Sequence, residues 1–154
     1  MAFASGLYVI NLIDVLDATQ LALDLSLATH KLALYTNTKT PDFSADAGYD
    51  ATNEVSGTNW AAGGVALSAA AAGASSVTPT VTDVSGTLKY TFTNAVSVAT
   101  TTLTNARGLI MYADALAGNN NIFAVTFGAD YSTVAGTFGI TPHANGLFAI
   151  DCVP

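Results

Sequence analysis

The sequence predicts a mainly β protein, an antiparallel β-sandwich or jelly-roll-like fold with a short N-terminal helix. From Val65 onward, short runs of Val, Thr, Phe and Ile alternate with Gly, Asn, Asp or Pro. Strands this short and this regularly spaced are typical of sandwiches and barrels. The length of 154 residues suits one domain with its own core. We therefore expect residues 1–154 to form a single β-rich domain.

The N-terminal segment has the spacing of a helix. Within residues 7–24, apolar side chains such as Leu12 and Leu16 recur every three to four positions, which indicates one helical face. The alternating leucines of residues 21–27 compete with this interpretation, because a period of two is typical of strands. We favour a short helix followed by a strand over residues 30–37.

Residues 41–63 are predicted to form a long loop. This range is rich in Pro, Asp, Gly and Asn, and it also holds the aromatic residues Phe43, Tyr49 and Trp60. Long loops inside compact domains tend to be functional or mobile.

Seven further strands are predicted after this loop, each bounded by turn-forming residues. They are expected at 76–84, 86–93, 95–103, 107–113, 121–128, 135–141 and 146–150. One short element recurs without a fixed period, as VSGT at 55–58 and 84–87 and as VAGT at 134–137. At each copy we expect glycine to turn the chain and the β-branched threonine to begin the next strand.

The composition is unusually poor in charge. Only 10% of residues are charged, against about 25% in ordinary domains, and 51% are apolar. We therefore expect the exterior to be a Thr/Ser/Asn-rich β surface or to be covered by neighbouring subunits. The net charge is −7, and the basic residues are Lys31, Lys39, Lys89 and Arg107. Four dispersed cations do not form the clustered footprint of nucleic-acid or anionic-membrane binding, so we expect neither partner.

The sequence also bears on the compartment. The N-terminus lacks the basic start of a signal peptide, and no apolar run approaches the length of a membrane span. We expect a protein made and kept in a cytoplasm, or packaged into a particle built there. Cys152 is the only cysteine, which excludes an internal disulfide, and we predict that it is a small buried hydrophobe.

The glycine-rich stretch EVSGTNWAAGGVAL, residues 54–67, invites a phosphate-binding interpretation. A P-loop requires a lysine and a hydroxyl residue directly after its last glycine, and here Val65 and Ala66 follow Gly64. The glycine spacing also differs from the dinucleotide-binding fingerprint. We expect a turn near Gly57 and a strand that starts near Val65.

No constellation of chemically active residues stands out. His30 and His143 lie far apart, and no nucleophile-elbow motif presents a serine. Three aspartates recur every four residues, at Asp42, Asp46 and Asp50, but the alternating ligands and closing glutamate of a calcium loop are missing. We therefore predict no catalytic residues, no metal site and no cofactor, with His143 exposed in a turn.

The order of several motifs resembles a widespread group of small virion proteins of tailed bacteriophages. The segments that carry the resemblance are KLALYTNTKTPD, EVSGTNWAAGG, ATTTLTNARGLIMYAD and the C-terminal NIFAVTFGADYSTVAGTFGITPHANGLFAID. The group shares an EVSG-x-x-Y/W-x-x-GG loop, which Glu54, Trp60 and Gly64 match here. The resemblance covers residues from about 30 to 151. The Thr-Pro-His after the last long strand departs from the group, which has a polar residue or tryptophan there.

The resemblance implies a non-enzymatic structural role. The leading hypothesis is a capsid decoration, or cement, protein on the outside of a virion that binds the major capsid protein as a homo-oligomer, a trimer at local three-fold sites. We then expect the 41–63 loop to be a contact arm with Phe43, Tyr49, Glu54 and Trp60 as interface residues, because tryptophan is enriched at binding hot spots. The alternative is that Trp60 packs into its own core. Rival functions are a tail or neck component and a glycan-binding β-sandwich module.

Overall fold

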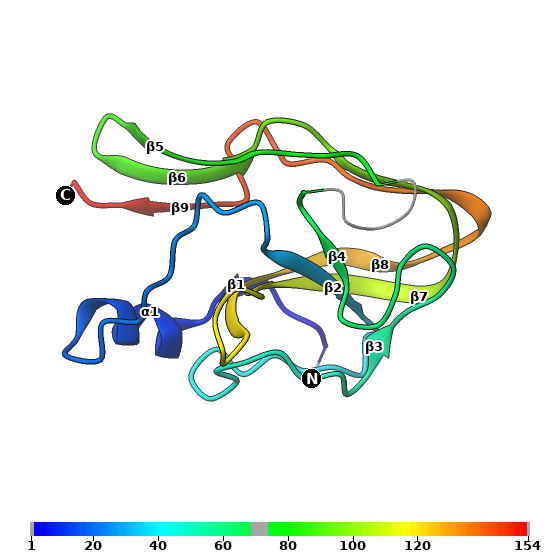
Figure 1. Ribbon diagram of the computed structural model, residues 1–154, viewed down its shortest axis with the longest axis horizontal. Helices are drawn as coiled ribbons and strands as arrows, with labels where there is room; N and C mark the ends of the chain where they lie inside the picture. The colour runs from blue at the N-terminus through cyan, green and yellow to red at the C-terminus, as the bar shows by residue number, and fades with distance from the viewer. Residues whose placement is uncertain (1, 69–73, 154) are drawn as a thin grey trace.

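Two antiparallel sheets form the layers of the protein (Figure 1). The computed structural model describes residues 2–68 and 74–153. The larger sheet has the order β1-β8-β7-β2-β3, with β4 also paired to β2, and the smaller sheet has the order β5-β6-β9. The elements are β1 (Gly6–Leu7), α1 (Val9–Leu16), β2 (Lys31–Tyr35), β3 (Glu54–Val55), β4 (Val65–Ala66), β5 (Pro79–Val84), β6 (Thr87–Phe92), β7 (Val96–Ala113), β8 (Asn120–Ile140) and β9 (Phe148–Asp151). The predicted mainly β, sandwich-like fold with one short helix is confirmed.

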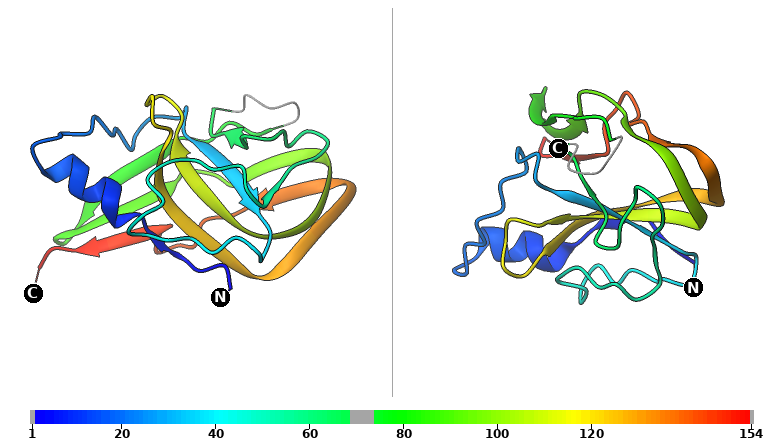
Figure 2. Two further views of the ribbon diagram at one scale, coloured as in Figure 1. Left: turned by 90° about the horizontal axis from the view of Figure 1, so that it is seen from below. Right: turned by 45° about the vertical axis from the view of Figure 1, so that its right-hand side comes forward.

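The longest element is a single bent hairpin where four short strands were predicted. Strands β7 and β8 pair from Val96–Ile140 to Ala113–Asn120, with register shifts in the middle. Residues with positive φ occur at this point on both strands, including Asn105 on β7 and Gly128 on β8. Bulges of this kind bend a strand without ending it, so turn-forming residues at 104–106 and 128–135 were misread as strand boundaries. The bend carries the hairpin from the lower layer to the upper one (Figure 1, Figure 2).

The VSGT elements adopt three different structures. In residues 84–87, Ser85 and Gly86 both have positive φ and join β5 to β6, as in a type I′ turn. In residues 55–58, Gly57 instead forms a β-bridge with Trp60. In residues 134–137, the positive φ is that of Ala135, inside the bend of β8. The predicted turn-and-strand role is therefore right only at 84–87.

Both faces of the larger sheet are buried, which explains the uninterrupted apolar run of β2. Leu32 and Leu34 point into the main core between the sheets. The intervening Ala33 and Tyr35 belong to a second cluster on the outer face. Phe43 and Tyr49 pack against this second cluster, so the 41–63 segment covers the outside of the sheet.

The segment between α1 and β2 contains turns and no strand. The predicted helix ends at Leu16, and the alternating leucines that follow do not pair with a sheet; Leu23 and Leu25 are half-buried against the main core. In the described parts of the chain, no helix has the length and apolarity to cross a membrane. Cys152 is exposed, so its prediction as a buried hydrophobe is wrong. It follows β9, an edge strand of the smaller sheet that has a neighbouring strand on one side only.

Candidate protein-docking surface

Trp60 lies in the core and is not a surface anchor. Its side chain is 0% exposed, and its ring meets the edge of Phe138 at a centroid distance of 5.4 Å. Phe138 lies near the end of β8, beyond the bend of the hairpin. The predicted role of Trp60 as an exposed anchor is therefore wrong, and the alternative, that it packs into its own domain, is what the structure has.

Glu54 holds the two ends of its glycine-rich motif together. Its Oε2 accepts a hydrogen bond from the Tyr49 hydroxyl at 2.7 Å, and its Oε1 accepts one from the backbone N–H of Gly63 at 2.8 Å. The Tyr112 hydroxyl donates to the Gly63 carbonyl at 2.6 Å. Burial, followed by the bond to Glu54, raises the pKa of Tyr49 to about 12. These bonds use Glu54 and Tyr49 within the chain, so their side chains serve the fold here.

The remaining predicted interface residue, Phe43, is also packed internally. Its ring lies 5.2 Å from that of Tyr8. Nearby, the ammonium of Lys39 lies 3.4 Å from Asp46 and 3.2 Å from Asp50. Two of the three regularly spaced aspartates thus face a buried lysine. These contacts, with the packing of Phe43 and Tyr49 against the second cluster, hold the 41–63 segment against the rest of the chain, which argues against a free contact arm.

The chemically active residues remain dispersed. Within residues 2–68 and 74–153, no three His, Cys, Asp or Glu side chains gather as metal ligands. His143 is exposed in a turn, as predicted. His30 is buried; its Nε2 lies 2.8 Å from the Asp24 carbonyl, and burial lowers its pKa.

Helix α1 buries a polar residue and exposes apolar residues, which is the reverse of an ordinary amphipathic helix. Its buried residue is the polar Asn11, whose Nδ2 donates to the carbonyls of Ala47 and Asn121 at 2.5 and 2.7 Å. Four of its six large apolar residues are exposed instead, and Ile10 and Val15 are half-buried. The exposed set is Val9, Leu12, Ile13 and Leu16, and Leu16 is 80% exposed. A helix in a monomer normally turns its apolar face to the core, so this face is suited to a partner.

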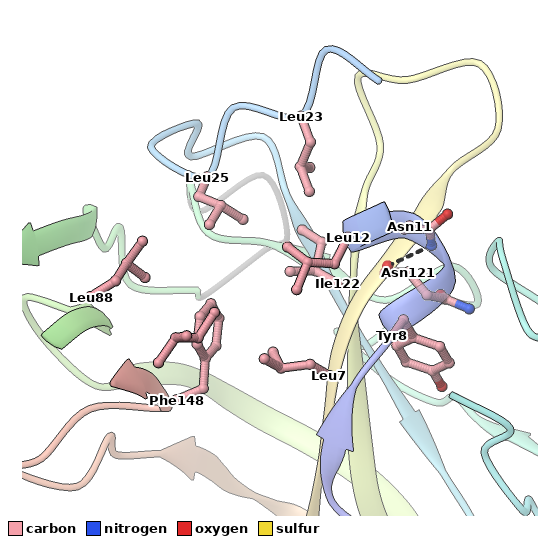
Figure 3. Close-up of a pocket in the computed structure, with 11 residues that line it drawn as sticks. Leu7, Tyr8, Asn11, Leu12, Leu23, Leu25, Leu88, Asn121, Ile122 and Phe148 are labelled. Carbon is pink, nitrogen blue, oxygen red and sulfur yellow. Dashed lines mark hydrogen bonds between the residues drawn. The ribbon is translucent and has the colours of Figure 1, made fainter. Parts of the chain in front are cut away.

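An apolar cleft of about 80 Å³ adjoins the helix (Figure 3). It separates α1 and the segment after it from the smaller sheet, and its wall is almost entirely carbon. Its lining includes Leu12, Leu23, Leu25, Leu88, Phe148 and Ile150. This volume is well below the roughly 300–1,000 Å³ of small-molecule pockets. The cleft therefore suits a side chain of a partner protein better than a free ligand.

More exposed apolar residues lie at the same end of the molecule. Val81 and Val84 of β5 and Val153 of the C-terminal tail are each more than two-fifths exposed. The β5–β6 turn, the C-terminus and α1 share one end in both Figure 1 and Figure 2. We call this surface, made of the exposed face of α1, the cleft and these three valines, the apolar end. Exposed apolar surface gathered in this way typically marks an interaction site.

Comparisons with protein-family models, with curated proteins and with solved structures found no match.

The sequence contained a signal for α1 but not for its orientation. Helical spacing is visible at Leu12, Ile13 and Leu16, and we predicted from it a short helix with one apolar face. The face of α1 that packs against the rest of the chain is marked by a single buried residue, Asn11. Its buried role depends on carbonyls 36 and 110 residues away, which a local pattern does not reveal.

Proposed function

We propose that this protein is a non-enzymatic structural protein of a bacteriophage particle, one that decorates the capsid exterior by docking its apolar end on the major capsid protein. The observation that carries the proposal is the inverted helix α1, which buries Asn11 and exposes Leu16. The ordered motifs between residues 30 and 151 support the phage assignment by resemblance.

The energetics of the apolar end suit assembly. Fully burying one Leu or Ile side chain contributes about 1.5–3 kcal/mol. Ile13 and Leu16 are 54% and 80% exposed, so most of this contribution is still available for binding. On a symmetric shell, such a module would occupy equivalent sites as a homo-oligomer, and we propose a trimer. Synthesis in the host cytoplasm followed by attachment to the virion fits this role.

Binding to purified empty capsid shells of the phage tests the proposal. Leu16→Asp should abolish co-sedimentation with the shells while its melting temperature stays close to that of the wild type, because Leu16 makes few contacts within the chain. The matched control is Val134→Asp, which places the same charge on a residue that is 87% exposed at the bend of β8. Docking through the apolar end would be refuted if both variants lost binding equally, or if neither variant lost binding. Capture by purified tails instead of shells would favour the tail or neck alternative.

A second candidate function, glycan binding, is favoured by a groove near the bend of β8. The groove has a volume of about 460 Å³, in the range of ligand pockets, and Phe127, Tyr131 and His143 contribute to its lining. Half of the Tyr131 side chain is exposed. The Nδ1 of His143 accepts the N–H of Asn145 at 3.1 Å, which leaves Nε2 as the protonated nitrogen of the neutral ring. An aromatic face beside polar donors suits a neutral sugar.

Titration of neutral oligosaccharides, followed by NMR, tests this second candidate. Shifts of the Tyr131 and His143 resonances that disappear in Tyr131→Ala would support it. Shell binding lost in Tyr131→Ala but retained in Leu16→Asp would instead place the shell contact at the groove.

A further inference from the structure

The carboxylates around the apolar end indicate the kind of surface that covers it. Each lies beside a residue of the cleft or on α1 itself: Asp14, Asp17, Asp24, Asp83 and Asp151. Asp24 stands between the cleft residues Leu23 and Leu25, Asp83 lies opposite Leu88 across the β5–β6 pair, and Asp151 follows Ile150. None of the ion pairs among the described residues includes any of these five carboxylates.

Helix α1 carries its own negative charges at the unfavourable end. Asp14 lies in its last turn and Asp17 is its C-cap, with no acidic residue in the first turn and no basic residue in the last. The C-terminus of a helix has a partial negative charge, so carboxylates there are destabilising and cations are stabilising. A Lys or Arg from outside the chain would relieve this repulsion, and the helix has no such residue of its own.

Three of the four basic residues are paired with carboxylates, and the fourth, Lys89, donates to a carbonyl. Lys31 pairs with Asp114 at 3.0 Å, and Arg107 pairs with Asp130 at 2.6 Å. Lys39 lies between its two aspartates, and the Lys89 ammonium donates to the Ala144 carbonyl at 2.5 Å. Among the described residues, Lys89 is thus the basic side chain without a carboxylate partner, so a second copy would bring that one ammonium against five carboxylates. Two copies joined end to end would bring their carboxylates together around an apolar centre.

We infer that the partner of the apolar end is a different protein chain whose docking surface is an apolar patch bordered by Lys or Arg. The five carboxylates around the apolar end would raise the rate of its association. The inference rests on the proposed function. An exposed ion pair adds little affinity at physiological salt, about 0–1 kcal/mol. Complementary charge mainly raises the association rate, and salt screens this effect over about 10 Å at 0.1 M.

Association kinetics on immobilised shells, at 50 and 500 mM NaCl, test the inference. The triple variant Asp14→Asn, Asp17→Asn, Asp24→Asn removes three charges, and asparagine retains an acceptor for the turns that Asp17 and Asp24 form with Thr19 and Ser26. We expect the wild-type association rate to fall at least about tenfold between the two salts. The triple variant should associate several-fold more slowly at low salt, lose most of the salt dependence and dissociate at the wild-type rate. Asp17→Asn is compared with Asp42→Asn, which removes one exposed charge outside the apolar end.

The outcomes separate this inference from the proposed function. If Leu16→Asp abolishes shell binding but the triple variant binds as fast as the wild type at low salt, the docking surface stands and the basic partner is refuted. An equal effect of Asp42→Asn and Asp17→Asn would also refute it, because net charge alone would then explain the kinetics. Self-association of the wild type that Leu16→Asp abolishes would assign the apolar end to a second copy. If the wild type does not bind shells, the proposed function fails first.

Discussion

Replacing Trp60 by alanine tests whether the glycine-rich motif belongs to the core. The side chain is 0% exposed and contacts Phe138 edge to face. It also sits in a segment that bridges to β7, since Thr58 pairs with Thr102. The substitution therefore leaves a cavity under the bend of the long hairpin, where two strands that already carry bulges have limited freedom to collapse.

The expected loss is large on the scale of the whole fold. Truncation of a buried Trp to Ala costs about 3–5 kcal/mol, out of a total of about 5–15 kcal/mol for a typical domain. For a chain of this length, each kcal/mol lowers the melting temperature by about 2–4 °C, so Trp60→Ala should melt roughly 6–20 °C below the wild type. Thermal unfolding followed by circular dichroism measures the shift.

Trp60→Phe is the matched control. The indole Nε1 is buried with no hydrogen-bond partner among the described residues, so phenylalanine loses ring volume without losing a hydrogen bond. We expect it to lose less than half as much stability as the alanine variant. A melting temperature of Trp60→Ala within about 2 °C of the wild type, combined with weakened shell binding, would refute core packing and restore the contact-arm hypothesis.

Three further predictions follow from buried polar groups and backbone geometry. Glu54→Ala should lower the free energy of unfolding by about 2–4 kcal/mol in urea titrations, because it leaves the Tyr49 hydroxyl and the Gly63 N–H without their acceptor; Glu54→Gln should cost less, and equal losses would contradict the paired-acceptor role. Gly64→Ala should destabilise the protein far more than Gly128→Ala: both glycines have positive φ, which costs about 1–2 kcal/mol for alanine, but a methyl at Gly64 meets the Leu32 carbonyl whereas nothing lies within 4 Å at Gly128. His30 has a pKa lowered by burial from 6.5, so the unfolded chain binds its proton first and stability falls as the pH drops below about 6.5. Urea titrations at pH 7.5 and 5.5 measure the drop in the free energy of unfolding between the two pH values. The drop should be present in His143→Gln, which keeps the buried His30, and smaller in His30→Gln.

The predictable part of the fold was the part that depends on local pattern. Strands β2, β5, β6 and β9 were each found within a few residues, because alternation and flanking turn residues mark them. The long hairpin was not predicted as one unit, since Asn105 and Gly128 have the chemistry of turns and the geometry of bulges. Only the pairing partner decides between these, and pairing is a property of the whole sheet.

The interface assignment rested on a related local rule. Phe43, Tyr49 and Trp60 were assigned to a partner because they lie in a polar, glycine-rich loop. In the structure Phe43 and Tyr49 cover the outer face of the larger sheet, where Ala33 and Tyr35 belong to the second cluster, whereas Trp60 packs in the main core. A composition rule identifies a loop, but it does not say whether the loop lies on solvent or on a sheet.

The inverted helix is the point at which local preference and tertiary structure disagree most. Natural sequences usually make these levels agree, and disagreement concentrates at functional sites. Helix α1 has no side-chain N-cap, has carboxylates at its negative end and is anchored by Asn11 rather than by its leucines. The missing cap and the carboxylates weaken the helix in the isolated chain, and the exposed apolar side chains contribute no burial to it. A partner that buries Leu16 and places a cation near Asp17 would reverse two of them at once, so the order of α1 should increase on binding. Slower hydrogen exchange of the α1 amides on shells than in free solution is the expected result, and unchanged exchange would mean that α1 is not the docking element.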